Sequence, residues 1–178
     1  MKTGRIIAVV GPSGVGKDSV MAGLMARHPD LRAAKRVITR PSDAGGEAFD
    51  GVSADEFARL NGQGAFALSW QAHGLSYGIP AEVADWIAAG HDVLANLSRN
   101  VLSEAALRFA HVVVLSITAS PAVLATRLAA RGREDAQDIA ARLARQVPLP
   151  EGLNIVEIDN SGTIEVAIAA AEAGLFKG

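Results

Sequence analysis

The stretch GPSGVGKDS, from Gly11 to Ser19, constrains the fold of this chain more than any other feature. It follows IIAVV, a β-branched run typical of a buried parallel strand. It precedes SVMAGLMAR, in which apolar residues recur at helical spacing. A strand, a glycine-rich loop and a helix in this order match the phosphate-binding pattern G-x-x-x-x-G-K-[ST] at every position but the last. The motif therefore predicts an α/β fold that binds a nucleotide.

The residue types of this loop explain how it would hold phosphate. Gly11, Gly14 and Gly16 allow backbone conformations that turn successive N–H groups inward, where the positive end of the next helix adds to the attraction. Lys17 adds a mobile cation for the β- and γ-phosphates. The predicted ATP-binding residues of the loop are Gly11, Pro12, Ser13, Gly14, Val15, Gly16, Lys17, Asp18 and Ser19. A glycine-rich turn without a ligand is the alternative.

Asp18 stands where the motif has a serine or threonine, and Ser19 brings the hydroxyl one residue later. The helix dipole stabilises an acid in the first turn by about 0.3–1 kcal/mol. Against this, two unit charges ~5 Å apart at an effective dielectric of ~20 repel by roughly 3 kcal/mol, unless a cation lies between them. The strand at 92–97 also runs into Ser98 and Arg99, without the acid that often holds magnesium in such enzymes. Asp18 and Ser19 are therefore predicted to bind Mg²⁺, and helix capping is the alternative for Asp18.

The rest of the chain alternates apolar strands with helices. Strands are predicted at 92–97, 111–117 and 153–159, and helical segments at 100–110, 121–132, 139–147 and 163–175. This alternation predicts a parallel sheet covered by helices on both faces, the three-layer α/β/α fold of P-loop proteins. Residues from about 34 to 90 break the rhythm and hold both tryptophans and the only tyrosine. We predict one domain, with a core at about 1–33 and 91–178 and an inserted acceptor-binding region at about 34–90.

Composition and charge exclude several other classes of protein. A formal net charge of -2 argues against general binding to nucleic acid or to a membrane surface, which usually needs a basic excess. The chain has no cysteine, so disulfides and thiolate metal sites are excluded. The first apolar run, at 6–10, is too short for a signal peptide, and no stretch is long enough to span a bilayer. We expect a soluble cytoplasmic protein with small-molecule partners, and its oligomeric state stays open.

Several motifs resemble those of the guanylate kinase superfamily and follow in the same order along nearly the whole chain. They are GPSGVGK in the loop, TRPSDAGGEAFDG and WQAHGLSYG in the inserted region, and ATRLAARGRE followed by IAARLAR. The last two resemble the lid and the helix after it, which implies a lid at about 131–138. The resemblance further implies ATP and Mg²⁺ as cofactors. It assigns Lys17, Arg131 and Arg142 to catalysis and Arg133 to ATP binding; an ordinary i, i+4 pair with Asp138 also explains Arg142.

Departures from the guanylate kinase pattern concern the acceptor. Guanylate kinases read the guanine base with a glutamate before the tryptophan, where this chain has Ser69, and a hydroxyl cannot accept two N–H bonds as a carboxylate does. NLSR replaces an acidic pair and adds Arg99. Together these features resemble a branch of the superfamily that converts ribose 1,5-bisphosphate into 5-phosphoribosyl 1-diphosphate with ATP. A nucleoside monophosphate kinase, most plausibly guanylate kinase, and a non-catalytic binding module of the same fold are the alternatives.

The predicted acceptor site combines cations for two phosphates with acceptors for ribose hydroxyls. Its residues are Arg36, Arg40, Glu47, Asp50, Tyr77 and Arg99. The resemblance implies that Arg40 and Tyr77 bind an acceptor phosphate. Plain packing would also explain Tyr77, and exposure to solvent would also explain Glu47, Asp50 and Arg99.

Overall fold

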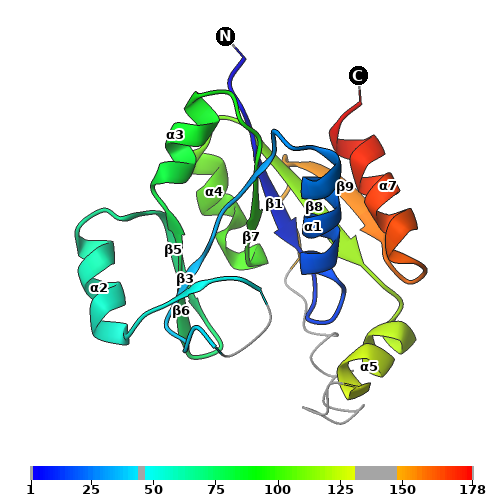
Figure 1. The fold of residues 1–178 in the computed structure, drawn as a ribbon, viewed down its shortest axis with the longest axis horizontal. Coiled ribbons are helices and arrows are strands. Elements are labelled where there is room, and N and C mark those ends of the chain that lie inside the picture. The colour runs from blue at the N-terminus through cyan, green and yellow to red at the C-terminus, as the bar shows by residue number, and fades with distance from the viewer. Residues whose placement is uncertain (1, 44–46, 131–147, 178) are drawn as a thin grey trace.

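Five parallel strands form the main sheet of the computed structural model, which describes residues 2–43, 47–130 and 148–177 (Figure 1). In spatial order they are β2 (Arg32–Ala33), β7 (Val93–Asn96), β1 (Ile6–Val10), β8 (Val112–Thr118) and β9 (Asn154–Asp159). The central strand β1 is buried at every residue, as expected for a parallel strand with both faces covered.

Helices cover the two faces of this sheet (Figure 1). On one face, α1 (Lys17–Arg27) and α7 (Ile164–Leu175) enclose a core that contains Ile7 and Val9. On the other face, Ile6 and Ala8 pack with α3 (Glu82–Ala88) and α4 (Leu102–Arg108). Because side chains alternate along a strand, the unbroken apolar run IIAVV supplies both cores. The predicted three-layer α/β fold is confirmed.

Four strands form a second sheet, in the order β4-β3-β6-β5. They are β4 (Asp50–Gly51), β3 (Val37–Ile38), β6 (Leu75–Pro80) and β5 (Phe66–Ala72). Helix α2 (Ala54–Gly62) packs against this sheet through Phe57, whose ring stacks on Phe66 with centroids 4.8 Å apart. Leu68 and Ile79 of this sheet belong to the same core cluster as Val93 of β7, so the two sheets are packed together.

Two further helical elements each follow a strand of the main sheet. The 3₁₀ helix η1 (Arg99–Val101) follows β7, and α5 (Pro121–Ala130) follows β8. The helix predicted at 139–147 lies outside the described residues. None of the helices in the described ranges is both long and apolar enough to cross a membrane.

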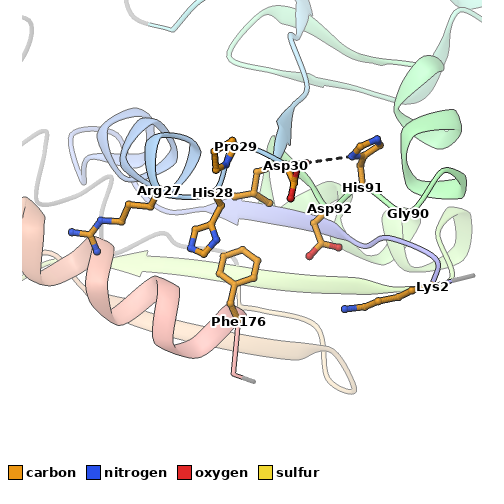
Figure 2. A pocket seen from close by; sticks show the side chains of 10 residues that line it. Lys2, Arg27, His28, Pro29, Asp30, Gly90, His91, Asp92 and Phe176 are labelled. Carbon is orange, nitrogen blue, oxygen red and sulfur yellow. Dashed lines mark hydrogen bonds between the residues drawn. The ribbon is translucent and has the colours of Figure 1, made fainter.

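The C-terminal end of α7 packs near the amino-terminal ends of the strands of the main sheet. A cavity of about 290 Å³ lies there (Figure 2). Phe176 stacks on His28 with centroids 4.3 Å apart, and the Glu172 carboxylate contacts both Arg27 Nη1 and His28 Nε2 at 2.9 Å. Arg5 Nη2 donates to the carbonyl oxygen of Leu175 at 3.0 Å. These contacts tie α7 to α1 and β1 at the end of the sheet opposite the phosphate loop.

Candidate active site

The phosphate loop lies between the carboxyl end of β1 and the amino end of α1, the usual ligand-binding edge of a parallel sheet. Gly14 and Gly16 have φ angles of 82° and 98°, which are left-handed values that favour glycine. A Cβ atom at Gly11 would lie 2.6 Å from the carbonyl oxygen of Ile117. The backbone therefore requires all three predicted glycines, two for their conformation and one for close approach to β8.

Lys17, the first residue of α1, is folded back onto this loop. Its Nζ donates to the carbonyl oxygen of Gly11 at 2.6 Å. The pKa of Lys17 is lowered to about 8, mainly by burial and also by the charge of Arg36, while Asp18 opposes both effects. An anion bound in the loop would restore a favourable environment for this poorly solvated ammonium group.

Directly before β3, Arg36 is held by an acid and by an aromatic ring. Its Nε donates to Glu47 Oε2 at 3.0 Å, and its Nη2 contacts Oε1 of the same carboxylate. Its guanidinium carbon lies 4.9 Å from the centroid of the Tyr77 ring. Tyr77 in turn stacks on Trp70, with ring centroids 5.4 Å apart and an interplanar angle of 8°. The structure thus brings together three of the six predicted acceptor residues.

Electrostatic interactions join this group to the phosphate loop. The pKa of Arg36 is lowered to about 10, mainly by burial; Tyr77 and Asp18 oppose this effect, and the charge of Arg40 adds to it. Arg36 therefore interacts with both Asp18 and Lys17, which begin α1. The charges of the loop and of the residue directly before β3 therefore influence each other, although the two segments are separate in the sequence.

The other predicted acceptor residues have different surroundings. The Arg40 guanidinium carbon lies 4.3 Å from the centroid of the Phe49 ring, a cation–π contact. The Asp50 carboxylate pairs with Lys35 at 2.9 Å on the surface, where both side chains are 57% exposed. Arg99 begins η1, directly after β7. Arg131, Arg133 and Arg142, with the predicted lid at 131–138, lie outside the described residues.

A cavity of about 460 Å³ lies between the phosphate loop and the loop that follows β9. Asn160 lines it, is 4% exposed, and donates from Nδ2 to the carbonyl oxygen of Val15 at 2.8 Å. Because Nδ2 makes this bond, the orientation of the amide is set. Oδ1 is then buried with no hydrogen-bond partner in the described part of the chain.

Arg127 of α5 lines the same cavity, and the sequence reasoning did not single it out. Its Nη2 donates to the carbonyl oxygen of Asn160 at 2.7 Å, and its Nη1 to that of Val15 at 3.4 Å. It is the only charged residue in the helical run PAVLATRLAA. The sequence feature that could have indicated a role for Arg127 is a single charge within an otherwise apolar helix, because such a residue needs polar partners where the helix packs.

Asp18 and Ser19 lie side by side in the first turn of α1, both exposed. Within the described ranges, no group of three histidine or acidic side chains could enclose a metal ion. The carboxylate oxygens of Asp18 and the hydroxyl oxygen of Ser19 suit Mg²⁺, which commonly completes its coordination shell with phosphate oxygens and water. The oxygen atoms of Asp18 and Ser19 are therefore chemically compatible with a magnesium ion that binds together with a nucleotide.

Ser69 occupies the position where guanylate kinases have the base-reading acid. Its hydroxyl donates to Asn61 Oδ1 of α2 at 3.3 Å. The next residue is Trp70, which stacks on Tyr77. No carboxylate stands at this point of β5.

Comparisons with known proteins agree with this architecture. Residues 3–153 match the family model described as guanylate kinase. The ribose 1,5-bisphosphate phosphokinase PhnN of a Ruegeria species is 54% identical over 172 residues, which cover 96% of this chain and 90% of that protein. The PhnN protein of Pseudomonas fluorescens is 48% identical over 169 residues, covering 90% and 89%. A crystal structure of guanylate kinase from Anaplasma phagocytophilum superposes with a TM-score of 0.71 at 21% identity, covering 97% of this chain and 86% of that chain, and so shares the fold.

Proposed function

The chain belongs to the guanylate kinase family and, within it, to the ribose 1,5-bisphosphate phosphokinases, and from this we propose that it phosphorylates ribose 1,5-bisphosphate with ATP. The product is 5-phosphoribosyl 1-diphosphate. The observation that carries the proposal is the intact phosphate loop, in which Lys17 Nζ donates to the carbonyl oxygen of Gly11 at 2.6 Å, in a chain 54% identical to a ribose 1,5-bisphosphate phosphokinase. The effect of the Arg36 charge on Lys17 supports an acceptor site next to the donor site, as phosphoryl transfer requires.

The reaction transfers one phosphoryl group in line. An oxygen of the acceptor's 1-phosphate forms a bond to the γ-phosphorus of ATP, and the bond from that phosphorus to the β,γ-bridging oxygen breaks. ADP leaves with the bond's electron pair. Because a phosphate oxygen is already an anionic nucleophile, the protein needs to position reactants and offset charge rather than supply a strong base.

Donor binding is assigned to the loop backbone and to Lys17. The ammonium group of Lys17 would exchange the Gly11 carbonyl for phosphate oxygens. Asp18 and Ser19 would hold Mg²⁺, which would supply positive charge to offset that of the donor phosphates. Arg131 and Arg142 are assigned to charge stabilisation on the transferring phosphoryl group, and Arg133 to ATP, from the sequence resemblance.

The adenine of ATP is assigned to the cavity beside Asn160. The exocyclic amino group of adenine is a donor that the buried Oδ1 of Asn160 would accept. Arg127 supports this wall of the cavity through its bonds to the carbonyl oxygens of Asn160 and Val15.

The acceptor is assigned to the inserted region at about 34–90 together with Arg99. Arg40 and Arg99 are assigned to its phosphates, with Tyr77 as a donor to one of them. Glu47 and Asp50 are assigned to hydroxyls of the ribose. ATP and a phosphorylated sugar are metabolites of the cytoplasm, where we place the protein.

The test offers the protein ATP, Mg²⁺ and one acceptor at a time, either ribose 1,5-bisphosphate or GMP. ADP release and phosphorus NMR of the product are measured. We expect 5-phosphoribosyl 1-diphosphate from the first acceptor and little turnover of GMP. Lys17→Met should abolish the activity, while Lys177→Met, an exposed lysine near the C-terminus, should retain it. Turnover of GMP alone would identify a guanylate kinase, and no turnover with weak ATP binding would identify a binding module.

A further inference from the structure

Arg36 and Glu47 form a bidentate ion pair with each other within the protein. Nε and Nη2 of the guanidinium meet the two oxygens of one carboxylate. This is the same edge-on geometry that an arginine uses for a phosphate. The two side chains are only 12% and 15% exposed, so most of this pair is shielded from water.

An incoming phosphate is poorly suited to replace Glu47 on Arg36. Exchange would leave the Glu47 carboxylate without its counter-ion in a place with little access to water, which is strongly unfavourable. The displaced carboxylate would also lie close to the phosphate that displaced it, and the two anions would repel each other. The pair is therefore expected to remain intact when the acceptor binds.

An intact pair still offers a specific set of hydrogen-bonding groups. The two N–H bonds of Arg36 Nη1 and the second N–H of Nη2 are additional to those used by Glu47, and each carboxylate oxygen has a further lone pair. Donors and acceptors thus stand side by side in a unit without net charge. Adjacent hydroxyl groups have the complementary pattern, because each hydroxyl donates one hydrogen bond and accepts others.

The stacked rings of Tyr77 and Trp70 restrict the orientation of the Arg36 guanidinium group. The guanidinium lies over the Tyr77 ring at 4.9 Å, and Tyr77 is itself stacked on Trp70. Glu47 on one side and the ring on the other limit rotation of the arginine, so its donors keep one direction. Such preorganisation makes a polar site selective, because an analogue that lacks a partner leaves buried groups unsatisfied.

We propose that the Arg36–Glu47 pair recognises the 2- and 3-hydroxyl groups of the acceptor's ribose and selects ribose over 2-deoxyribose. The inference rests on the proposed function, since it concerns the same acceptor. It changes the role expected for Arg36 from binding phosphate to binding the sugar. The phosphates are then left to other cations of the site.

The experiment compares kcat/KM for ribose 1,5-bisphosphate and 2-deoxyribose 1,5-bisphosphate at saturating ATP. We expect the unaltered protein to prefer ribose by about 100-fold or more. Glu47→Gln preserves the side-chain shape but removes the charge and the bidentate pairing. We expect it to reduce the preference to less than about tenfold, mainly by slowing the reaction of the ribose substrate. Glu56→Gln is the matched control, because Glu56 pairs with Arg59 on the exposed side of α2 and should leave the preference unchanged.

Three outcomes would overturn the inference. They are equal use of both sugars by the unaltered protein, an unchanged preference in Glu47→Gln, and a KM in that variant that falls equally for both sugars. The last result would mean that Glu47 competes with an acceptor phosphate. A thermal unfolding scan checks folding, and Glu47→Asp, which shortens the acid, should give an intermediate preference if Glu47→Gln is unstable. An unaltered protein that uses neither sugar would contradict the proposed function itself.

Discussion

Asn160 Nδ2 donates to the carbonyl oxygen of Val15 at 2.8 Å and so joins the loop after β9 to a phosphate loop 145 positions earlier in the chain. Arg127 bonds to the carbonyl oxygens of both residues. The conformation of the phosphate loop therefore depends on two distant segments as well as on its own glycines.

Replacing Asn160 should loosen the phosphate loop. Asn160→Ala removes the buried bond to Val15, and we expect the free energy of unfolding to fall by about 1–3 kcal/mol. The KM for ATP should rise about tenfold, because the loop and the cavity wall lose a shared support. Denaturant unfolding and steady-state kinetics measure the two effects. Asn154→Ala, at the exposed start of β9, serves as the control, and similar values in both variants would contradict the role of Asn160.

The activity should decline at alkaline pH as Lys17 loses its proton. Burial lowers the pKa of Lys17 to about 8 in the protein without ligand, so the cation is present below pH 8 and is lost above it. The value of kcat/KM for ATP, which reports the free protein, should fall about tenfold per pH unit above about pH 8. Lys17→Arg should lack this decline whatever its absolute rate, since guanidinium stays charged. A profile that is flat to pH 9.5 in the unaltered protein would contradict the prediction.

Lys17 should also lower the stability of the fold at neutral pH. Its folded pKa of about 8 is below the ordinary 10.5, so the unfolded chain binds more protons between these values and stability rises with pH across this window. Below pH 8 the unfavourable burial of the charge is fully present. Lys17→Met should therefore raise the free energy of unfolding at pH 7 by roughly 1–3 kcal/mol, since one pKa unit corresponds to about 1.4 kcal/mol and the bond to Gly11 is lost, and by less near pH 10. Lys177→Met should show no such difference, and a destabilised Lys17→Met would refute the argument.

Asp18 should set the requirement for magnesium. We expect Asp18→Asn to raise the Mg²⁺ concentration needed for half-maximal rate by about tenfold at constant ATP, because one oxygen ligand loses its charge. A titration of rate against Mg²⁺ measures this. Asp55→Asn is the control, since Asp55 is also an acid in the first turn of a helix, α2. If Asp18→Asn has a slightly lower free energy of unfolding but needs the same Mg²⁺ concentration for half-maximal rate, the prediction is contradicted. Asp18 would then act only through its favourable interaction with the helix dipole.

At pH values above its pKa, Glu172 should stabilise the packing of α7 against α1. Hydrogen bonds from Arg27 and His28 lower the pKa of Glu172 below the ordinary 4.5, so its contribution exists at neutral pH and is lost as the pH falls from 4.5 through the folded pKa. Glu172→Gln should unfold at a lower temperature than the unaltered protein at pH 7, and the gap should narrow below pH 4.5. Glu157→Gln, on β9, is the control. A gap that is constant with pH would contradict the prediction.

Local patterns in the sequence predicted the core of the fold. The run at 6–10, the glycine loop and the helix after Lys17 are recognisable because strand, turn and helix each have a short-range signature. The later strands at 93–96, 112–118 and 154–159 were predicted for the same reason. The two-residue strand β2 was not, since it carries too few residues for any periodicity.

The sequence by itself determined the phosphate loop and the alternation of strands and helices, because glycine conformation and hydrophobic period depend on neighbouring residues. Its order of motifs also indicated the guanylate kinase family, which the comparisons confirmed. The partners of single polar side chains were decided only by the tertiary structure. The pairing of Arg36 with Glu47, the surface position of Asp50 and the bonds of Arg127 depend on which segments packing brings within about 3 Å of each other. Hydrogen bonds have that range in space and no fixed range along the chain, so these partners could not be inferred from sequence spacing.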